Sequence, residues 1–216
     1  MLELGLKTLI AYLLGSAMGA LLVGGLRGVD IREQGSGNAG GTNALRTQGF
    51  WFAVATVVVD VGKGWLAAGW LPGLALPGVA ADPAVGRDWL AAACAAAAVA
   101  GHVWPLFYEF RGGKGGATLI GALAALAPAT VPVALFVWLM VAMFSGFAGL
   151  ATMLAAISVP VAAWLLYPGA RPLLALAVAM AAFIVWAHRA NIARMRAGNE
   201  ARLGRLWLFG PRTPRA

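Results

Sequence analysis

Charged side chains are scarce in this sequence. Only 11% of its 216 residues are Asp, Glu, Lys or Arg, whereas an ordinary soluble domain carries about 25%. Hydrophobic residues make up 61%, so too few polar side chains remain to cover a surface that faces water. The composition excludes an ordinary soluble domain and predicts an integral membrane protein, with residues 1–216 forming a single domain.

Cysteine and histidine are almost missing as well. Cys94 is the single cysteine, which excludes an intrachain disulfide and a cysteine-based metal site. The two histidines, His102 and His188, stand where apolar segments meet polar ones, and each can be structural or part of a site. We expect no metal and no cofactor. The formal net charge of +8 indicates membrane orientation and anionic partners rather than nucleic acid.

Four apolar segments are candidates for helices that cross the roughly 30 Å hydrocarbon core. They are residues 4–26, 50–71, 89–104 and 172–187. The first segment has no small-residue cleavage site after it, so we expect a retained helix rather than a signal peptide. Residues 115–170 carry no charge and are too many for one span. Natural breaks fall at 128–132 and 145–149.

Positive charges predict how these helices lie in the membrane. Twelve of the 16 Lys and Arg residues lie in segments 27–49, 106–116 and 188–216. The positive-inside rule puts all three polar segments in the cytoplasm and the N-terminus outside. An even number of spans must then separate the last two segments, so residues 115–170 must supply three. We therefore predict an all-α protein with seven transmembrane helices and a cytoplasmic C-terminus. Five spans with one long kinked helix is the alternative.

The first polar segment is rich in glycine and small polar residues. Gly35, Gly37 and Gly40 match GxGxxG, but a dinucleotide site needs a preceding strand and a βαβ unit, and an apolar helix precedes this loop. Glycines let backbone N–H groups point toward an anion, and Arg46 adds a planar charged fork. The neutral side-chain donors are Ser36, Asn38, Thr42 and Asn43. The loop is either an anion site or a flexible connection between two helices.

The second polar segment places Lys114 among four glycines. It is not a Walker A loop, because Gly115 follows the lysine where Ser or Thr is required. Glycines around a lysine at a helix start do combine backbone donors, the positive helix end and a point charge. Arg111 and Lys114 either bind an anion or only mark the cytoplasmic side.

The third polar segment and one apolar segment hold further candidates. His188 and Asn191 are three residues apart and share one helix face. The basic tail 202–215 is expected to contact anionic lipid headgroups. Asp60 and Lys63 are charges within an apolar span, so they either neutralise each other or help shape a polar site.

These segments resemble one known family. GSGNAGGTN before Arg46, then HVWPLFYEFRGGKGGAT, then HRANIARMRAGNE, are similar in content and order to the PlsY family of bacterial acyl-phosphate:glycerol-3-phosphate acyltransferases. The resemblance covers nearly the full chain. It implies a seven-helix fold of the bacterial inner membrane with its active site facing the cytoplasm. It also implies transfer of a fatty acyl group from acyl phosphate to glycerol 3-phosphate, giving lysophosphatidic acid in the first step of phospholipid synthesis.

The resemblance also implies a set of site residues and partners. The catalytic set would be Ser36, Arg46, Lys114, His188 and Asn191. The substrate-binding set would be Gly35, Gly37, Asn38, Thr42, Asn43, Gly113, Gly115, Thr152 and Glu200. No protein general base is implied, because substrate phosphate helps to deprotonate the attacking hydroxyl. The expected partners are the two substrates and membrane lipids, with no obligate protein partner.

The sequence departs from the family pattern at a few places. Ala17-Met18 stand where the family usually has Ile-Pro, and a serine pair before the sixth helix appears here as Gly149 and Thr152. The main rival function is a secondary transporter of an organic phosphate, but the sequence shows no repeated halves. An acyl-CoA type of acyltransferase would need a His-x4-Asp pair, which neither histidine has. A non-catalytic scaffold would leave the three donor-rich segments unexplained.

Overall fold

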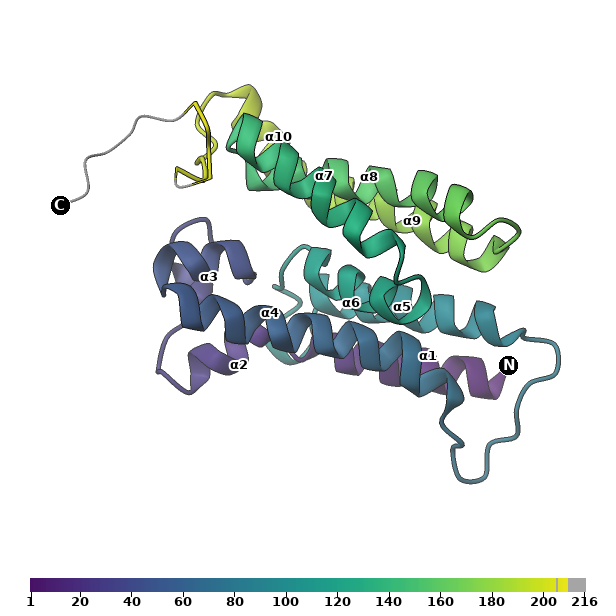
Figure 1. Cartoon of the computed structure of the whole chain (residues 1–216). Helices are drawn as coiled ribbons and strands as arrows, with labels where there is room; N and C mark the ends of the chain where they lie inside the picture. Colours follow the sequence, from purple (N-terminus) through teal and green to yellow (C-terminus); the bar gives the residue numbers. More distant parts are fainter. Residues whose placement is uncertain (205, 210–216) are drawn as a thin grey trace.

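The computed structural model describes residues 1–204 and 206–209, and this part of the chain is all-helical without strands. The helices form two layers (Figure 1). The first layer holds α1 (Leu2–Ser16), α2 (Gly19–Gly25), α3 (Gly41–Thr47), α4 (Phe50–Trp65), α5 (Arg87–Val103) and α6 (Gly116–Leu126). The second holds α7 (Thr130–Ser145), α8 (Ala148–Leu166), α9 (Arg171–Ala187) and α10 (Arg189–Arg196). Short turns are η1 (Ile31–Glu33), η2 (Leu66–Trp70), η3 (Leu71–Gly73) and η4 (Leu106–Tyr108).

The uncharged stretch 115–170 forms three helices, α6, α7 and α8, as predicted. The first break falls just after α6, at 127–129, and the second is at Gly146, whose φ of +75° suits the end of a helix. Among the described residues, three helices have the length and hydropathy of a full span, or five if the bent pairs α1–α2 and α9–α10 each count as one. Because α6 and α7 are shorter than about 20 residues, seven crossings stay a prediction.

The first predicted span is broken in two. Between α1 and α2 the chain bends by 50°, and Ala17 is extended, with φ −72° and ψ 94°. A break inside the membrane frees backbone groups that need partners. Lys63 Nζ donates to the Ala17 carbonyl at 2.9 Å, and the Gly19 N–H donates to Asp60 Oδ1 at 3.1 Å. Asp60 and Lys63 also pair at 3.0 Å, so these two charges neutralise each other next to the break.

Small residues let the helices of the first layer pack closely. A Cβ added to Gly15 would lie 2.1 Å from the Ala98 carbonyl oxygen, and one added to Gly121 would lie 1.9 Å from the Val61 carbonyl oxygen. Such contacts are typical of helices that associate within a membrane. They hold α1 against α5 and α4 against α6, and this rigid layer carries the polar loops.

A cluster of charged residues, here called the outer clasp, ties the other end of the molecule together. It consists of Glu3, Lys7 and Arg87. Glu3 Oε1 lies 2.7 Å from both Lys7 Nζ and Arg87 Nη1. Lys7 also donates to the Pro72 carbonyl at 2.8 Å, and Glu3 accepts from the Asp82 N–H at 2.9 Å. The clasp joins the first turns of α1 and α5 to the segment around η3.

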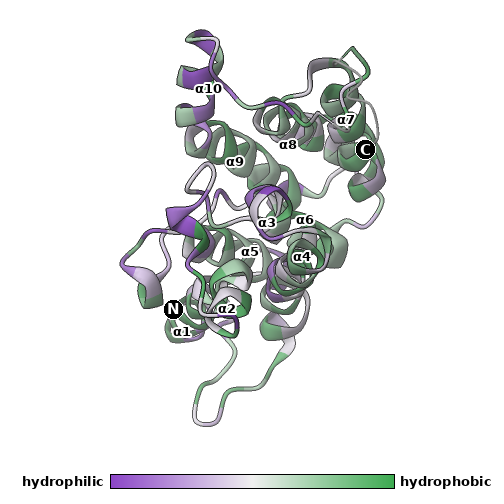
Figure 2. Cartoon of the chain, turned by 90° about the vertical axis from the view of Figure 1, so that its left-hand side faces the viewer, coloured by the Kyte–Doolittle hydropathy of each residue, from purple (hydrophilic) through white to green (hydrophobic). Residues whose placement is uncertain are grey.

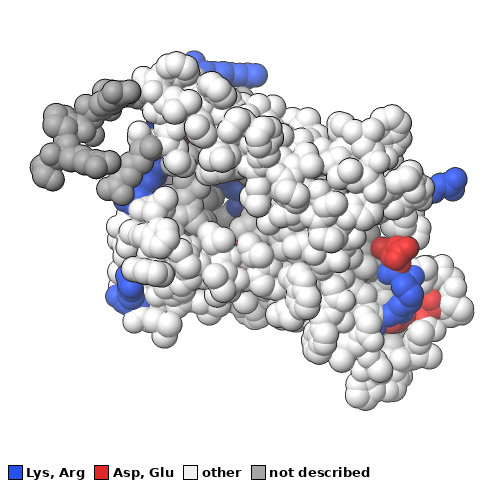
Figure 3. Space-filling model, viewed as in Figure 1, with Lys and Arg blue, Asp and Glu red and all other residues white. Residues whose placement is uncertain are grey.

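The three polar segments gather at the opposite end, here called the polar end. Figure 2 looks onto that end and shows hydrophilic residues along α10 and in the loops near α3. Arg32 Nη1 donates to the Tyr108 carbonyl at 3.1 Å, which links the first two segments. Figure 3 shows an uncharged belt between the charged groups of the two ends on this face. Of the basic tail, Arg205, Arg212 and Arg215 lie outside the described residues.

Candidate active site

A cavity of about 590 Å³ lies between the two layers and opens toward the polar end. Helices α3, α4 and α6 line it from the first layer, and α7, α8 and α9 line it from the second. Eleven of the fourteen site residues expected from the sequence line this cavity. They are Ser36, Asn38, Thr42, Asn43, Arg46, Lys114, Gly115, Thr152, His188, Asn191 and Glu200.

The remaining three, Gly35, Gly37 and Gly113, do not line the cavity. Gly35 has a φ of +56°, and a Cβ there would lie 2.4 Å from Asn43 Oδ1. A Cβ at Gly113 would lie 2.2 Å from His102 Nε2. At these two positions the missing side chain lets the backbone close onto a polar residue that lines the cavity, Asn43 or His102. Their geometry favours a supporting role over the direct substrate contact that was expected.

Asn43 holds the first loop in shape. Its side chain is 1% exposed. The amide nitrogen donates to the Ile31 and Gln34 carbonyls at 3.2 and 3.0 Å, and the amide oxygen accepts from the Ser36 N–H at 3.0 Å. With both amide N–H groups used inside the protein, Asn43 positions the loop rather than offering a donor to a substrate.

Lys114 and Asn191 meet across the cavity. Lys114 Nζ donates to Asn191 Oδ1, and Asn191 Nδ2 donates to Glu200 Oε1 at 2.6 Å. Glu200 also accepts from Arg194 Nε at 2.6 Å. Burial, together with the nearby positive charges of Arg194 and Arg46, lowers the pKa of Lys114 to about 8, although the negative charge of Glu200 partly offsets this. An ammonium group so deprived of water and surrounded by positive charge gains strongly from a bound anion.

Arg46 and His188 complete the polar wall. Arg46 Nη2 donates to the Ala201 carbonyl at 3.0 Å, which leaves the other guanidinium N–H groups for a ligand. His188 lies at the 50° bend between α9 and α10. Its Nδ1 is 2.7 Å from the Ile184 carbonyl oxygen. Because a carbonyl oxygen only accepts, Nδ1 carries a proton, and Nε2 is the nitrogen left for a ligand.

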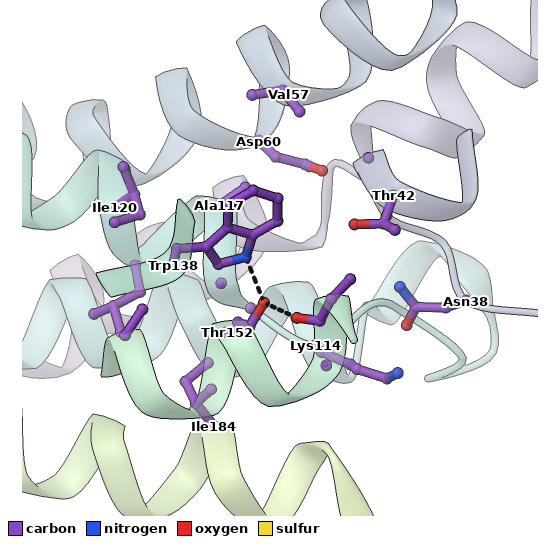
Figure 4. A pocket seen from close by; sticks show the side chains of 18 of the residues that line it. Asn38, Thr42, Val57, Asp60, Lys114, Ala117, Ile120, Trp138, Thr152 and Ile184 are labelled. Atoms are coloured by element: carbon purple, nitrogen blue, oxygen red, sulfur yellow. Dashed lines mark hydrogen bonds between the residues drawn. The ribbon is translucent and has the colours of Figure 1, made fainter. Parts of the chain in front are cut away.

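The other end of the cavity is apolar. Trp138 Nε1 donates to Thr152 Oγ1 at 3.1 Å, and that hydroxyl donates to the Ala148 carbonyl at 2.9 Å. Figure 4 shows Asn38, Thr42 and Lys114 toward one end and Ile120 and Trp138 toward the other. The Thr152 hydroxyl therefore holds the indole in place, whereas the sequence had indicated contact with substrate.

The apolar end also opens sideways. Its lining includes Val57, Val58, Val61, Ile120, Leu123, Leu135 and Val159. Val58 is 64% exposed and Leu135 is 51% exposed although both line the cavity. The cavity thus reaches the outer apolar surface between α4 and α7. A ligand with a charged head and a long apolar tail fits such a shape.

Three lining residues whose side chains can hydrogen-bond were missing from the expected set: Asp60, His102 and Trp138. His102 Nδ1 lies 3.5 Å from Asp60 Oδ1, and the His102 carbonyl accepts from the Gly113 N–H at 3.0 Å. The sequence did single out Asp60 and His102, one as an intramembrane charge and the other as a residue at the border of a span. Trp138 gave no signal, because it lies in a helix that is apolar on every side.

The fold and the cavity together define an integral membrane enzyme that joins an anionic headgroup to an apolar chain. Comparison with solved structures agrees. PlsY (YgiH), an integral membrane glycerol 3-phosphate acyltransferase, matches in its glycerol 3-phosphate form with a TM-score of 0.81 and 33% identity, over 94% of this chain and 96% of that one. Its lysophosphatidic acid form matches with a TM-score of 0.80 and 32% identity, over 95% and 97%.

Sequence comparison places the chain in a family. The family model described as glycerol-3-phosphate acyltransferase matches residues 6–198. A glycerol-3-phosphate acyltransferase of Halalkalibacterium halodurans is 38% identical over 211 residues, covering 94% of this chain and 98% of the relative. One of Thermosynechococcus vestitus is 42% identical over 202 residues, covering 93% and 95%. The chain belongs to the glycerol-3-phosphate acyltransferase family, and it is an acyltransferase.

Proposed function

We propose that this protein moves a fatty acyl group from acyl phosphate to glycerol 3-phosphate, releasing phosphate and lysophosphatidic acid. One observation carries the proposal: a single cavity presents anion-binding side chains at one end and an apolar, laterally open channel at the other. Both substrates are phosphates, and one carries a long apolar chain. The one-sided cluster of polar residues and the family membership favour this enzyme over a secondary transporter of an organic phosphate.

The polar end suits the glycerol 3-phosphate. The side chains of four residues from different segments of the chain line the cavity and supply charged and neutral donors: Arg46, Lys114, His188 and Asn191. In our proposal they hold the acceptor's phosphate, while Ser36 and the loop N–H groups lie at the donor. Holding two anions close together is the main task here, because fixed donors offset their repulsion and align the hydroxyl with the carbonyl.

The reaction itself needs little from the protein. The acceptor's hydroxyl oxygen forms a bond to the acyl carbonyl carbon, and the bond from that carbon to the phosphate oxygen breaks. The hydroxyl proton goes to the departing phosphate. Acyl phosphate is an activated mixed anhydride, so the positive groups of the polar end serve mainly to stabilise negative charge that develops on the oxygens.

The membrane setting belongs to the same proposal. We place the polar end in the cytoplasm and the outer clasp on the other side of the bacterial inner membrane, with seven crossings and the N-terminus outside. The distribution of Lys and Arg supports this orientation. The acyl chain then enters between α4 and α7 directly from the bilayer, while glycerol 3-phosphate arrives from the cytoplasm.

The proposal is tested by supplying purified protein in detergent with glycerol 3-phosphate and one of two acyl donors. We expect phosphate release and lysophosphatidic acid with palmitoyl phosphate, and no product with palmitoyl-CoA. Heat-inactivated protein controls for spontaneous hydrolysis of the acyl phosphate. Turnover with the CoA ester and none with the phosphate would overturn the proposed donor.

A further inference from the structure

The segment after α10 contributes Glu200 to the lining of the cavity. Residues 199–204 and 206–208 are here called the C-terminal strap, seen as the yellow segment above α3 in Figure 1. The strap forms backbone bonds with the turn between α7 and α8. The Leu203 N–H donates to the Gly146 carbonyl at 2.7 Å, and the Leu208 N–H donates to the Met143 carbonyl at 2.9 Å. The matched family region ends at residue 198, before the strap begins.

Arg202 anchors the strap to this turn. Its guanidinium carbon lies 4.5 Å from the centre of the Phe147 ring and 4.1 Å from the centre of the Trp207 ring. Arg202 Nη1 also donates to the Ser145 carbonyl at 3.2 Å. A guanidinium group between two aromatic rings gains from both cation–π contacts. One side chain therefore ties the strap to the end of α7, the start of α8 and its own neighbouring tryptophan.

Gly146 lies directly beneath Arg202 and Trp207 of the strap. Its φ is +75°, and a Cβ there would lie 3.0 Å from Trp207 Cγ and 3.2 Å from Arg202 Cβ. The missing side chain lets the strap lie against the turn. Alanine at this position would strain the backbone and push the strap outward.

The two strap residues before Arg202 hold the proposed phosphate site. The Ala201 carbonyl accepts from Arg46 Nη2 at 3.0 Å, and the Glu200 carboxylate accepts from Asn191 Nδ2 at 2.6 Å. Arg46 belongs to α3 in the first layer, whereas Arg202 is fixed to the turn between α7 and α8 in the second. The strap thus bridges the two layers where the proposed phosphate ligands Arg46 and Asn191 lie.

We propose that Arg202 is a positioning residue for glycerol 3-phosphate. By fixing the strap to Phe147 and Trp207, it sets the plane of the Arg46 fork through Ala201 and the orientation of the Asn191 amide through Glu200. Arg202 itself does not touch the substrate. The inference rests on the proposed role of Arg46 and Asn191 as phosphate ligands.

The test compares kinetic constants of purified Arg202→Ala with those of the parent. We expect the KM for glycerol 3-phosphate to rise about three- to tenfold, the scale of one or two lost cation–π contacts. The kcat and the KM for palmitoyl phosphate stay near the parent's, because the change weakens acceptor binding alone. Arg202→Lys keeps a cation over the rings and should recover most of the affinity. Arg196→Ala removes an exposed arginine of α10 at the same end and should behave like the parent.

Gly146→Ala disturbs the contact between the strap and the turn at Gly146 while leaving Arg202 in place. It should also raise the KM for glycerol 3-phosphate. A parental KM in both Arg202→Ala and Gly146→Ala, with a raised KM in Arg46→Ala, would overturn the role of the strap and leave the phosphate site standing. A parental KM in Arg46→Ala would overturn the phosphate site instead. A loss in kcat alone, or equal damage from Arg202→Lys and Arg202→Ala, would also contradict the inference.

Discussion

Arg46 and Lys114 hold different kinds of charge at the polar end. One N–H of Arg46 donates to the Ala201 carbonyl. Because the guanidinium group is planar, this bond fixes the direction of its remaining donors. Lys114 is a compact ammonium that donates to Asn191. In the proposed site the first supplies geometry and the second supplies a point charge. A role limited to marking membrane topology would require only that the charge be kept.

Arg46→Lys should therefore lower activity although it keeps the charge. We expect at least a tenfold loss in kcat/KM for glycerol 3-phosphate, since a charge-assisted contact contributes roughly 1.5–3 kcal/mol and about 1.4 kcal/mol corresponds to tenfold. The measurement is phosphate release by the purified variant after confirming that it is folded. Arg196→Lys, the same exchange on the surface of α10, is the matched control. If Arg46→Lys had the same kinetic constants as the parent, Arg46 would only mark the cytoplasmic side of the membrane and would not bind phosphate.

We expect the binding of glycerol 3-phosphate to depend on pH because of Lys114. Its pKa is lowered to about 8 in the unliganded protein, chiefly by burial, so the ammonium is present below pH 8 and is lost as the pH rises. The KM for glycerol 3-phosphate should rise above pH 8 by up to about tenfold per pH unit, because a bound phosphate requires the charged form.

The measurement is the KM for glycerol 3-phosphate between pH 7 and 9.5, above the second pKa of the substrate phosphate near 6. Lys114→Arg should abolish the alkaline rise, because arginine stays protonated throughout this range. It should also bind more weakly at pH 7, because the fork does not reproduce a point charge. An alkaline rise that persists in Lys114→Arg would assign the titration to another group.

The break between α1 and α2 depends on a neighbouring helix. Two backbone groups at the break, the Ala17 carbonyl and the Gly19 N–H, find their partners in Lys63 and Asp60 of α4. Both charged side chains are at most 5% exposed. The end of α1 and the start of α2 are thus fixed to α4 by one buried ion pair.

Asp60→Asn should destabilise the protein strongly. It leaves the Lys63 ammonium buried without a counter-charge, which costs about 3–5 kcal/mol when a buried pair is broken. The measurement is the thermal unfolding midpoint in detergent. Asp30→Asn removes an acid from a more exposed pair with Arg32, 2.7 Å apart, and should change the midpoint little. The double variant Asp60→Asn/Lys63→Met should be more stable than Asp60→Asn alone. Equal midpoints for Asp60→Asn and Asp30→Asn would contradict this role.

At the scale of the whole molecule, charge separates the two ends. The polar end carries an excess of arginine and holds the site, whereas in the outer clasp both Lys7 and Arg87 pair with Glu3. An uncharged belt lies between them on the face seen in Figure 3. Because positive charge favours the cytoplasmic side, a protein with this charge distribution should insert into a bilayer in one orientation.

Labelling of single cysteines in intact cells tests this orientation. In a Cys94→Ala background, Arg32→Cys, Gly112→Cys and Arg202→Cys should resist a membrane-impermeant maleimide until the cells are opened. Ala81→Cys, in the loop near the outer clasp, should react in intact cells and serves as the control. Reaction at any of the first three positions in intact cells would exclude a shared cytoplasmic end.

Much of this architecture followed from local sequence patterns. Over residues 115–170, the length of the uncharged stretch excluded a single helix, and the positive charges on either side required an odd number of spans, which predicted three helices and both breaks. The clustering of arginine and glycine in three segments predicted which residues would share one end. Of the fourteen site residues that the family resemblance implied, eleven line one cavity.

The tertiary structure alone decided how each donor is used. The bond from Arg46 to Ala201 joins residues 155 positions apart, and the bond from Lys114 to Asn191 joins residues 77 apart. Asn43 and Thr152 have the chemistry of substrate ligands, yet their hydrogen-bonding groups are taken by the protein itself. Composition and spacing determine which polar groups reach an end of the molecule. Whether such a group stays free for a ligand depends on partners that folding brings from distant parts of the chain, because a buried donor binds whichever acceptor lies nearest in space.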